Sequence, residues 1–276
     1  MPEYIDIHSH VTFAAFNEDR EAVVARTLEQ KTWMINVGTQ QATSKSAVEL
    51  AEKYEKGVYA IVGLHPIHTD ASHHDEQELG EGSKAFTSRG EAFDYGYYKQ
   101  LASHSKVVAI GECGLDYYRL ESDSVKKQKE TFEQHIALAD ELKKPLMLHV
   151  RNGSQKSAYT DAFEMLKTAA SVKGNVHFYV GSIEEAKPLL ERGCTFSFTG
   201  VITFARNYDD VIKYLPLEAI MSETDCPYVT PVPHRGTRNE PIYVQEVVKK
   251  IAEIKGLPFE RVRQQLVENA RNFFKI

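Results

Sequence analysis

The sequence predicts an α/β fold, a (β/α)8 TIM barrel, from two observations. Eight short and mostly apolar segments have the composition of strands covered on both faces, and segments with helical spacing lie between them. Strand and helix therefore alternate eight times, and a right-handed unit repeated this often closes into a barrel rather than an open sheet. The 276 residues suit one such barrel. We expect a single domain over residues 1–276.

The predicted elements follow each other without an interdomain linker. The strands are residues 4–8, 33–37, 58–64, 107–112, 146–150, 175–180, 195–198 and 219–223. The helices between them are residues 21–30, 44–56, 124–142, 159–170, 183–192 and 205–214. A Pro-rich loop over residues 227–241 precedes two more helices, 242–254 as the eighth outer helix and 258–273 as a terminal addition. A long polar connection, about residues 67–105, predicts an insertion over the barrel mouth with one helix near 91–103.

Composition excludes several classes of protein. The net charge of −6 gives no basic surface for a sequence-independent grip on phosphates, so any nucleic-acid contact has to be local. The three cysteines are widely spaced and do not form a zinc-finger or disulfide pattern. No signal-like leader and no run of about 18 apolar residues is present. We therefore expect a cytoplasmic protein that needs no membrane, and no obligate protein partner is evident.

Ionisable residues lie at the carboxyl ends of the predicted strands. In a barrel these ends share one mouth, and the catalytic groups of TIM barrels lie there. The residues concerned are His8, His10, His65, Glu112, His149, His177 and Asp225. A lone histidine at a strand end is usually a hydrogen-bonded core residue. An apolar barrel has little use for so many ionisable groups in one layer, so together they predict a functional site.

The pattern predicts a centre for two divalent metal ions. His8 and His10 would hold the first ion, with Asp225 from the neighbouring eighth strand completing its shell. His149 and His177 would hold the second, and Glu112 would give one carboxylate oxygen to each. Two cations so placed activate a water for attack on a phosphodiester, and Asp225 could orient or deprotonate that water. Imidazole and carboxylate ligands suit zinc, manganese or cobalt, while magnesium remains open through its abundance.

Other residues near the mouth are candidates for substrate binding. With both metal sites filled, His65 is assigned to substrate phosphate or to support of the ligands, although Pro66 makes a structural turn an alternative. Arg151, Arg235 and Arg238 are candidates for phosphate contact, because a guanidinium fork matches phosphate oxygens.

The motifs together resemble the TatD family of metal-dependent deoxyribonucleases in the amidohydrolase superfamily. The resemblance runs from Asp6 to Pro241 and includes Asp6-Ile7-His8-Ser9-His10, Gly111-Glu112-Cys113-Gly114-Leu115-Asp116-Tyr117 and Glu223-Thr224-Asp225-Cys226-Pro227. It implies the same six metal ligands, His8, His10, Glu112, His149, His177 and Asp225. It also implies hydrolysis of ester bonds, usually in DNA, with 3′–5′ exonuclease or AP-endonuclease-like activity in some members. Two departures concern the substrate cleft: His177-Phe178-Tyr179-Val180-Gly181 stands where the family has His-Cys-Phe-Ser-Gly, and the stretch from His65 to Gly111 is longer than usual.

Two alternatives remain beside the deoxyribonuclease. The same site could hydrolyse a small molecule, such as a lactone, cyclic amide or phosphoester, a reading that the acidic charge favours. Amidohydrolases of that kind often bridge their metals with a carboxylated lysine, and the fourth predicted strand ends in Glu112 instead. A barrel that binds metal without catalysis is the other alternative.

Overall fold

Eight parallel strands form the sheet that the sequence predicts. The computed structural model describes residues 1–74, 86–118, 124–154 and 156–276. The strands are β1 (Tyr4–Ser9), β2 (Thr32–Val37), β3 (Val58–Val62), β6 (Val107–Asp116), β7 (Leu146–Arg151), β8 (Gly174–Val176), β9 (Thr195–Phe198) and β10 (Ile220–Ser222). They pair in that order. The closing seam is short, an isolated parallel bridge between Ser9 and Cys226, so the predicted TIM barrel is confirmed as a nearly closed one.

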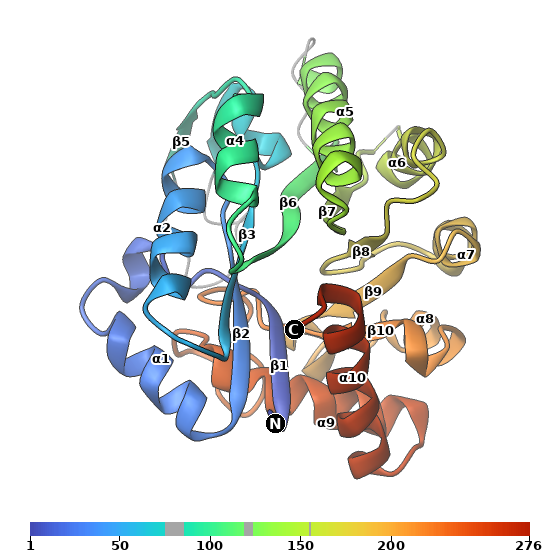
Figure 1. Cartoon of the computed structure of the whole chain (residues 1–276). Coiled ribbons are helices and arrows are strands. Elements are labelled where there is room, and N and C mark those ends of the chain that lie inside the picture. Colours follow the sequence, from blue (N-terminus) through green and yellow to red (C-terminus); the bar gives the residue numbers. More distant parts are fainter. Residues whose placement is uncertain (75–85, 119–123, 155) are drawn as a thin grey trace.

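Helices surround the strands (Figure 1). The outer helices are α1 (Arg20–Glu29), α2 (Gln41–Glu52), α4 (Tyr95–Ala102), α5 (Ser124–Leu142), α6 (Ala158–Leu166), α7 (Ile183–Glu191), α8 (Asp209–Tyr214) and α9 (Val244–Lys255). The terminal helix is α10 (Phe259–Phe274). No helix in the described part of the chain is both long and apolar enough to span a bilayer.

The helix α10 closes the end of the barrel opposite the loops that follow the strands. Its residues Ala270, Phe273 and Phe274 share one apolar cluster with Ile5 and Ile35 of the first two strands, and the C-terminus lies near the centre of the ring in Figure 1. The predicted terminal addition is therefore the floor of the barrel interior. In the described part of the chain, the end at which the loops follow the strands remains open for a site.

The insertion after β3 differs from its prediction. It begins with a short 3-10 helix (Pro66–His68) and contains an antiparallel hairpin of β4 (Ala71–His74) and β5 (Phe86–Arg89), which the sequence did not predict. The predicted helix near 91–103 is present as α4. The part of the insertion from 75 to 85 lies outside the described residues. Strand alternation was too short in this polar stretch to predict a hairpin.

Candidate metal centre

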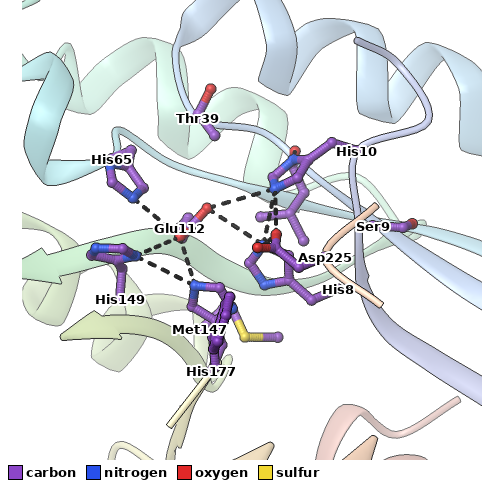
Figure 2. A network of polar contacts seen from close by, with 12 residues as sticks. His8, Ser9, His10, Thr39, His65, Glu112, Met147, His149, His177 and Asp225 are labelled. Atoms are coloured by element: carbon purple, nitrogen blue, oxygen red, sulfur yellow. Dashed lines mark hydrogen bonds and ion pairs between the residues drawn. The ribbon is translucent and has the colours of Figure 1, made fainter. Parts of the chain in front are cut away.

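A β-bulge in β1 brings His8 into the barrel. Ile7 packs in the interior, so strict alternation would turn His8 toward the helices. The register with β2 shifts between Asp6 and Ser9, where three positions of β1 face two of β2. The extra residue in β1 reverses the face of the sheet to which the following side chains point, so His8 and His10 both point inward (Figure 2).

A second bulge, in β6, does the same for Glu112. Ala109 packs in the interior, and alternation from it would place Glu112 on the outer face. The register with β7 shifts between Ile110 and Cys113, again three positions against two. The bulge returns Glu112 to the interior, where it is buried.

Two glycines let β6 lie close to β7 at this point. Gly111 has φ +149°, and a Cβ there would lie 2.5 Å from the carbonyl oxygen of Met147. Gly114 has φ +137°, and its Cβ would lie 2.2 Å from the carbonyl oxygen of His149. A larger residue at either position would force the strands apart, and Glu112 would move away from His149.

The remaining histidines and the aspartate follow their strands as predicted. His149 shares a face of β7 with the interior residue Met147, and His177 follows directly after β8. Asp225 lies three residues beyond β10 and has φ +55°, a left-handed conformation that Asp tolerates better than most residues. Hydrogen bonds from Asp225 N to His8 O (2.9 Å) and from His10 N to Cys226 O (2.9 Å) hold this turn against β1.

Glu112 lies at the centre of the cluster (Figure 2). Its Oε2 is 3.4 Å from His8 Nε2 and 4.0 Å from His10 Nε2. Its Oε1 is 2.9 Å from His177 Nε2 and 3.0 Å from His149 Nδ1. One carboxylate thus faces two groups of imidazoles, each with a different oxygen.

Asp225 and His65 complete the two halves. Asp225 Oδ1 lies 3.3 Å from His10 Nε2 and 3.6 Å from His8 Nε2. On the other side, His65 Nε2 lies 3.2 Å from Glu112 Oε1. His65, which the sequence left outside the ligand set, therefore lies among the candidate ligands in space.

Among the described residues, donor atoms converge closely enough to hold a cation in three combinations, two of which share His8. Each combination offers three ligand atoms within 4.8 Å of one another. They are His8 with His10 and Asp225, His65 with Glu112 and His149, and His8 with His177 and Glu223. The first combination has the same members as the predicted set for the first ion, apart from the shared Glu112.

Two carboxylates and a carbonyl lie behind the candidate ligands. Asp116 Oδ2 lies 2.8 Å from His149 Nε2, and Val37 O lies 2.9 Å from His10 Nδ1. Glu223 Oε1 lies 3.5 Å from His177 Nδ1. Partners of this kind hold a metal-binding imidazole in one orientation and raise its basicity. Sequence reasoning missed Asp116 and Glu223, although both stand inside motifs that it singled out.

The carboxylates of Glu112 and Asp225 remain ionised although they are buried. Burial alone would raise the pKa of Glu112, but His65, His177 and His8 outweigh it and hold that pKa well below its usual range. Burial also opposes ionisation of Asp225, and the hydrogen bond from His10 more than offsets it, so the pKa of Asp225 is lowered too. Glu112 and Asp225 therefore each carry a negative charge within the centre.

Positive charge is drawn to the imidazoles beside these carboxylates. Burial would lower the pKa of His177, yet Glu112 and Glu223 raise it well above its usual range. The pKa values of His149 and His10 are raised in the same way, against burial, by Asp116 and by Asp225 respectively. Carboxylates this close to buried imidazoles favour a positive charge among them, and a divalent cation can supply that charge in place of protons. Neutral imidazoles together with carboxylates are a donor set that divalent transition metals accept. The residues fit such ions.

The cluster forms the base of a cavity of about 390 Å³ at the open end of the barrel. Its charged members include Asp116 and Arg151, and its apolar wall is made of Phe13, Ile67, Phe178, Val180, Tyr208, Tyr228 and Val229. This volume accommodates a nucleotide-sized ligand.

The three predicted arginines lie in different surroundings. Arg151 lines the cavity, while Arg235 and Arg238 are not among its lining residues. Arg238 is bound by Asp19 and Glu240 at 2.7 and 3.0 Å. The structure thus brings only Arg151 to the cavity wall.

Comparison with known proteins places the chain in a family. The family model for TatD-related DNases matches residues 5–275. The chain is 36% identical to the uncharacterized metal-dependent hydrolase YabD of Bacillus subtilis, over 98% of each. It is 30% identical to the 3′-5′ ssDNA/RNA exonuclease TatD of Pantoea ananatis, again over 98% of each. The crystal structure of YJJV, a TatD homologue of Escherichia coli, superposes with a TM-score of 0.81 at 26% identity, covering 99% of this chain and 98% of YJJV.

The fold and site define a metal-dependent hydrolase built on a TIM barrel. The chain belongs to the TatD-related DNase family. The resemblance noted in the sequence is thereby confirmed.

Proposed function

We propose that this protein is a deoxyribonuclease of the 3′–5′ exonuclease type that uses two divalent cations. Its substrate would be single-stranded DNA or the 3′ ends of DNA. The observation that carries the proposal is the position of Glu112, with one oxygen toward His8 and the other toward His177 and His149. The name of the Pantoea ananatis relative, a 3′-5′ ssDNA/RNA exonuclease, supports the direction and the substrate class.

We assign the ligand sets according to the two halves of the cluster. His8, His10 and Asp225 would hold one ion, and His149 and His177 the other, with Glu112 shared between them. Zinc, manganese, cobalt and magnesium are the candidates, and the predominance of imidazole favours the first three. Cations bound here would lower the pKa of a water molecule and offset the charge of a phosphodiester.

The chain's own residues would handle the proton and the substrate. Asp225 is ionised and lines the cavity, so it can orient the attacking water and accept its proton. Burial lowers the pKa of His65 to about 4. Its neutral ring can therefore contact a substrate phosphate without carrying a charge of its own.

The arginines rank in this proposal by their surroundings. Arg151 lines the cavity and would contact substrate phosphate directly. Arg235 would act from the edge of the mouth. Arg238 is already neutralised by Asp19 and Glu240, so its contribution to phosphate binding would be the smallest.

The proposal is tested on purified protein with single-stranded DNA labelled at its 5′ end. With manganese or magnesium we expect stepwise shortening from the 3′ end and release of mononucleotides. The Asp225→Asn variant should lose this activity. Equal activity of the two proteins would reveal a contaminating nuclease or a wrong site. Elemental analysis of the same protein gives the number and identity of its ions.

A small-molecule hydrolase is the second candidate, favoured by the apolar wall of the cavity. Turnover of a panel of lactones, cyclic amides and phosphoesters without cleavage of any nucleic acid would select it. A single domain over residues 1–276 and a cytoplasmic location complete the proposal. All three cysteines are free and buried, which suits a reducing compartment.

A further inference from the structure

Exposed apolar side chains gather at the mouth of the barrel. Among the described residues, six large hydrophobic side chains are exposed, and two of them, Met1 and Tyr214, lie elsewhere. The other four are Tyr118, Val180, Phe204 and Val232. They belong to the loops that follow β6, β8, β9 and β10. Large apolar side chains exposed next to a catalytic cavity mark a binding surface.

These loops are neighbours around the barrel. The strands β6, β7, β8, β9 and β10 pair in sequence, so the described parts of the loops after them lie next to one another along one side of the mouth. β7 contributes Arg151 to it, and the loop after β10 also contributes Arg235. We call this set the rim arc, consisting of Tyr118, Arg151, Val180, Phe204, Val232 and Arg235.

Each exposed ring of the rim arc is paired with an arginine. The guanidinium carbon of Arg151 lies 3.7 Å from the centre of the Tyr118 ring, and that of Arg235 lies 4.2 Å from the centre of the Phe204 ring. Tyr118 is nevertheless 51% exposed and Phe204 43% exposed. One face of each ring is thus covered by a cation, while the rest remains open to a flat ligand.

The rim arc is continuous with the cavity. Arg151 and Val180 belong to both. On the far side, Val232 N donates to Thr203 Oγ1 (2.9 Å), beside Phe204, and Arg235 Nη1 donates to Thr230 O (3.0 Å), beside the lining residue Val229. A chain-like ligand leaving the metal centre would therefore pass directly onto this arc.

We propose that the rim arc binds a single-stranded nucleic acid next to the phosphate being cleaved. Bases stack on Tyr118 and Phe204, and the backbone phosphates contact Arg151 and Arg235. A duplex cannot use such a surface, because its base faces are already stacked, whereas a single strand offers them freely. With a net charge of −6, the two ring–arginine pairs supply the local positive charge that the protein lacks overall. This inference rests on the proposed nuclease function and adds to it the residues that select a single strand.

The test measures binding to the metal-loaded protein. Labelled phosphorothioate oligothymidylates of about two and eight nucleotides, which resist cleavage, are titrated by fluorescence anisotropy. We expect the longer strand to bind the wild type about 10-fold more tightly, because only it spans the arc. Tyr118→Ala and Phe204→Ala should each weaken binding of the longer strand by about 10-fold, as loss of a base–aromatic stack does. Tyr118→Trp, which keeps an aromatic ring at this position, should bind the longer strand about as tightly as the wild type does.

The matched control is Tyr214→Ala, an aromatic ring that is 41% exposed at the end of α8, away from the mouth. This variant should bind both strands as the wild type does. If Tyr118→Ala and Phe204→Ala also bind as the wild type does, the rim arc is not a nucleic-acid surface. Equal affinity of the wild type for duplex and single strand would overturn the proposal as well.

Failure of the rim arc and failure of the nuclease assignment give different results. Wild-type protein that shortens single-stranded DNA but shows no dependence on strand length overturns the rim arc alone. Length-dependent binding that is lost in Tyr118→Ala, without cleavage of DNA, supports the rim arc and removes the nuclease. Hydrolysis of bis(p-nitrophenyl) phosphate, which is too small to reach the arc, reports separately whether the metal centre is active.

Discussion

The base of the cavity and its rim are built on opposite principles. At the base, Glu112 and His8 are buried, and each lies within hydrogen-bond or ion-pair reach of several neighbours. At the rim, Tyr118 and Phe204 are exposed and have an arginine on one face only. Moving a buried charged group away from its partners costs a large amount of free energy, so the side chains at the base are held in one arrangement. The rim has no such constraint and can determine which substrate arrives.

Removal of the central carboxylate should have the largest effect. In Glu112→Gln the group shared by both halves of the base loses its charge, so metal affinity and kcat should both fall, kcat by about 1000-fold or more. Elemental analysis and steady-state hydrolysis of bis(p-nitrophenyl) phosphate check this. Glu253→Gln, an exposed partner of Lys250 on α9, is the control and should keep both values. Retention of two ions by Glu112→Gln would show that this carboxylate does not bridge them.

A smaller loss should follow from removing the support behind a ligand. Asp116→Asn takes away the carboxylate that lies 2.8 Å from His149 Nε2. Metal affinity should fall by about 10- to 100-fold, since such partners orient the ring and raise its basicity. Titration with zinc against a fluorescent chelator measures it. An unchanged affinity would mean that packing alone orients His149, and the base would then depend less on its hydrogen bonds than we infer.

Much of the base could be predicted from sequence. The candidate ligand His149 lies on an apolar strand in which alternation holds, so counting by twos from Met147 places it correctly. The candidate ligand His177 directly follows the next strand. The same count from Ile7 fails for His8, because the register shift in β1 intervenes. The prediction that His8 points into the mouth was right, although the alternation argument had omitted the bulge. Bulges depend on how two strands pair, and a single segment carries little sign of them.

The rim could hardly be predicted at all. Tyr118 and Phe204 stand in loops, where no period indicates a direction. An exposed aromatic and a buried one look the same in sequence: Tyr117 is buried while Tyr118, beside it, is exposed. The pairing of Arg235 with Phe204 joins loops from different strands, so it exists only after the barrel has closed.

Acid should lower the free energy of unfolding through His135 on α5. This buried ring accepts the backbone N–H of Leu64 (3.0 Å), the residue before His65, and burial lowers its pKa to about 4. The ring must be neutral in the folded protein, so its contribution is complete above pH 6.5 and is lost as the pH falls toward 4. That loss is roughly 3 kcal/mol. Urea unfolding across this range should show a steeper decline for the wild type than for His135→Gln; parallel curves would exclude His135 as the cause.

The smallest effects should separate the arginines. Arg151 lines the cavity, and among the described residues no carboxylate forms an ion pair with it. Arg238 is held by Asp19, whose pKa falls to about 2 chiefly through the hydrogen bond from that guanidinium. Arg151→Gln should therefore weaken binding of a single strand several-fold and reduce the slope of log affinity against log salt by about one. Arg238→Gln should change affinity by less than about 2-fold, because the Arg238 guanidinium is already paired with carboxylates of the protein. If the salt slope falls in Arg238→Gln but not in Arg151→Gln, the backbone phosphates contact the β1 side of the mouth rather than Arg151. The rim arc would then not be the surface that selects the substrate.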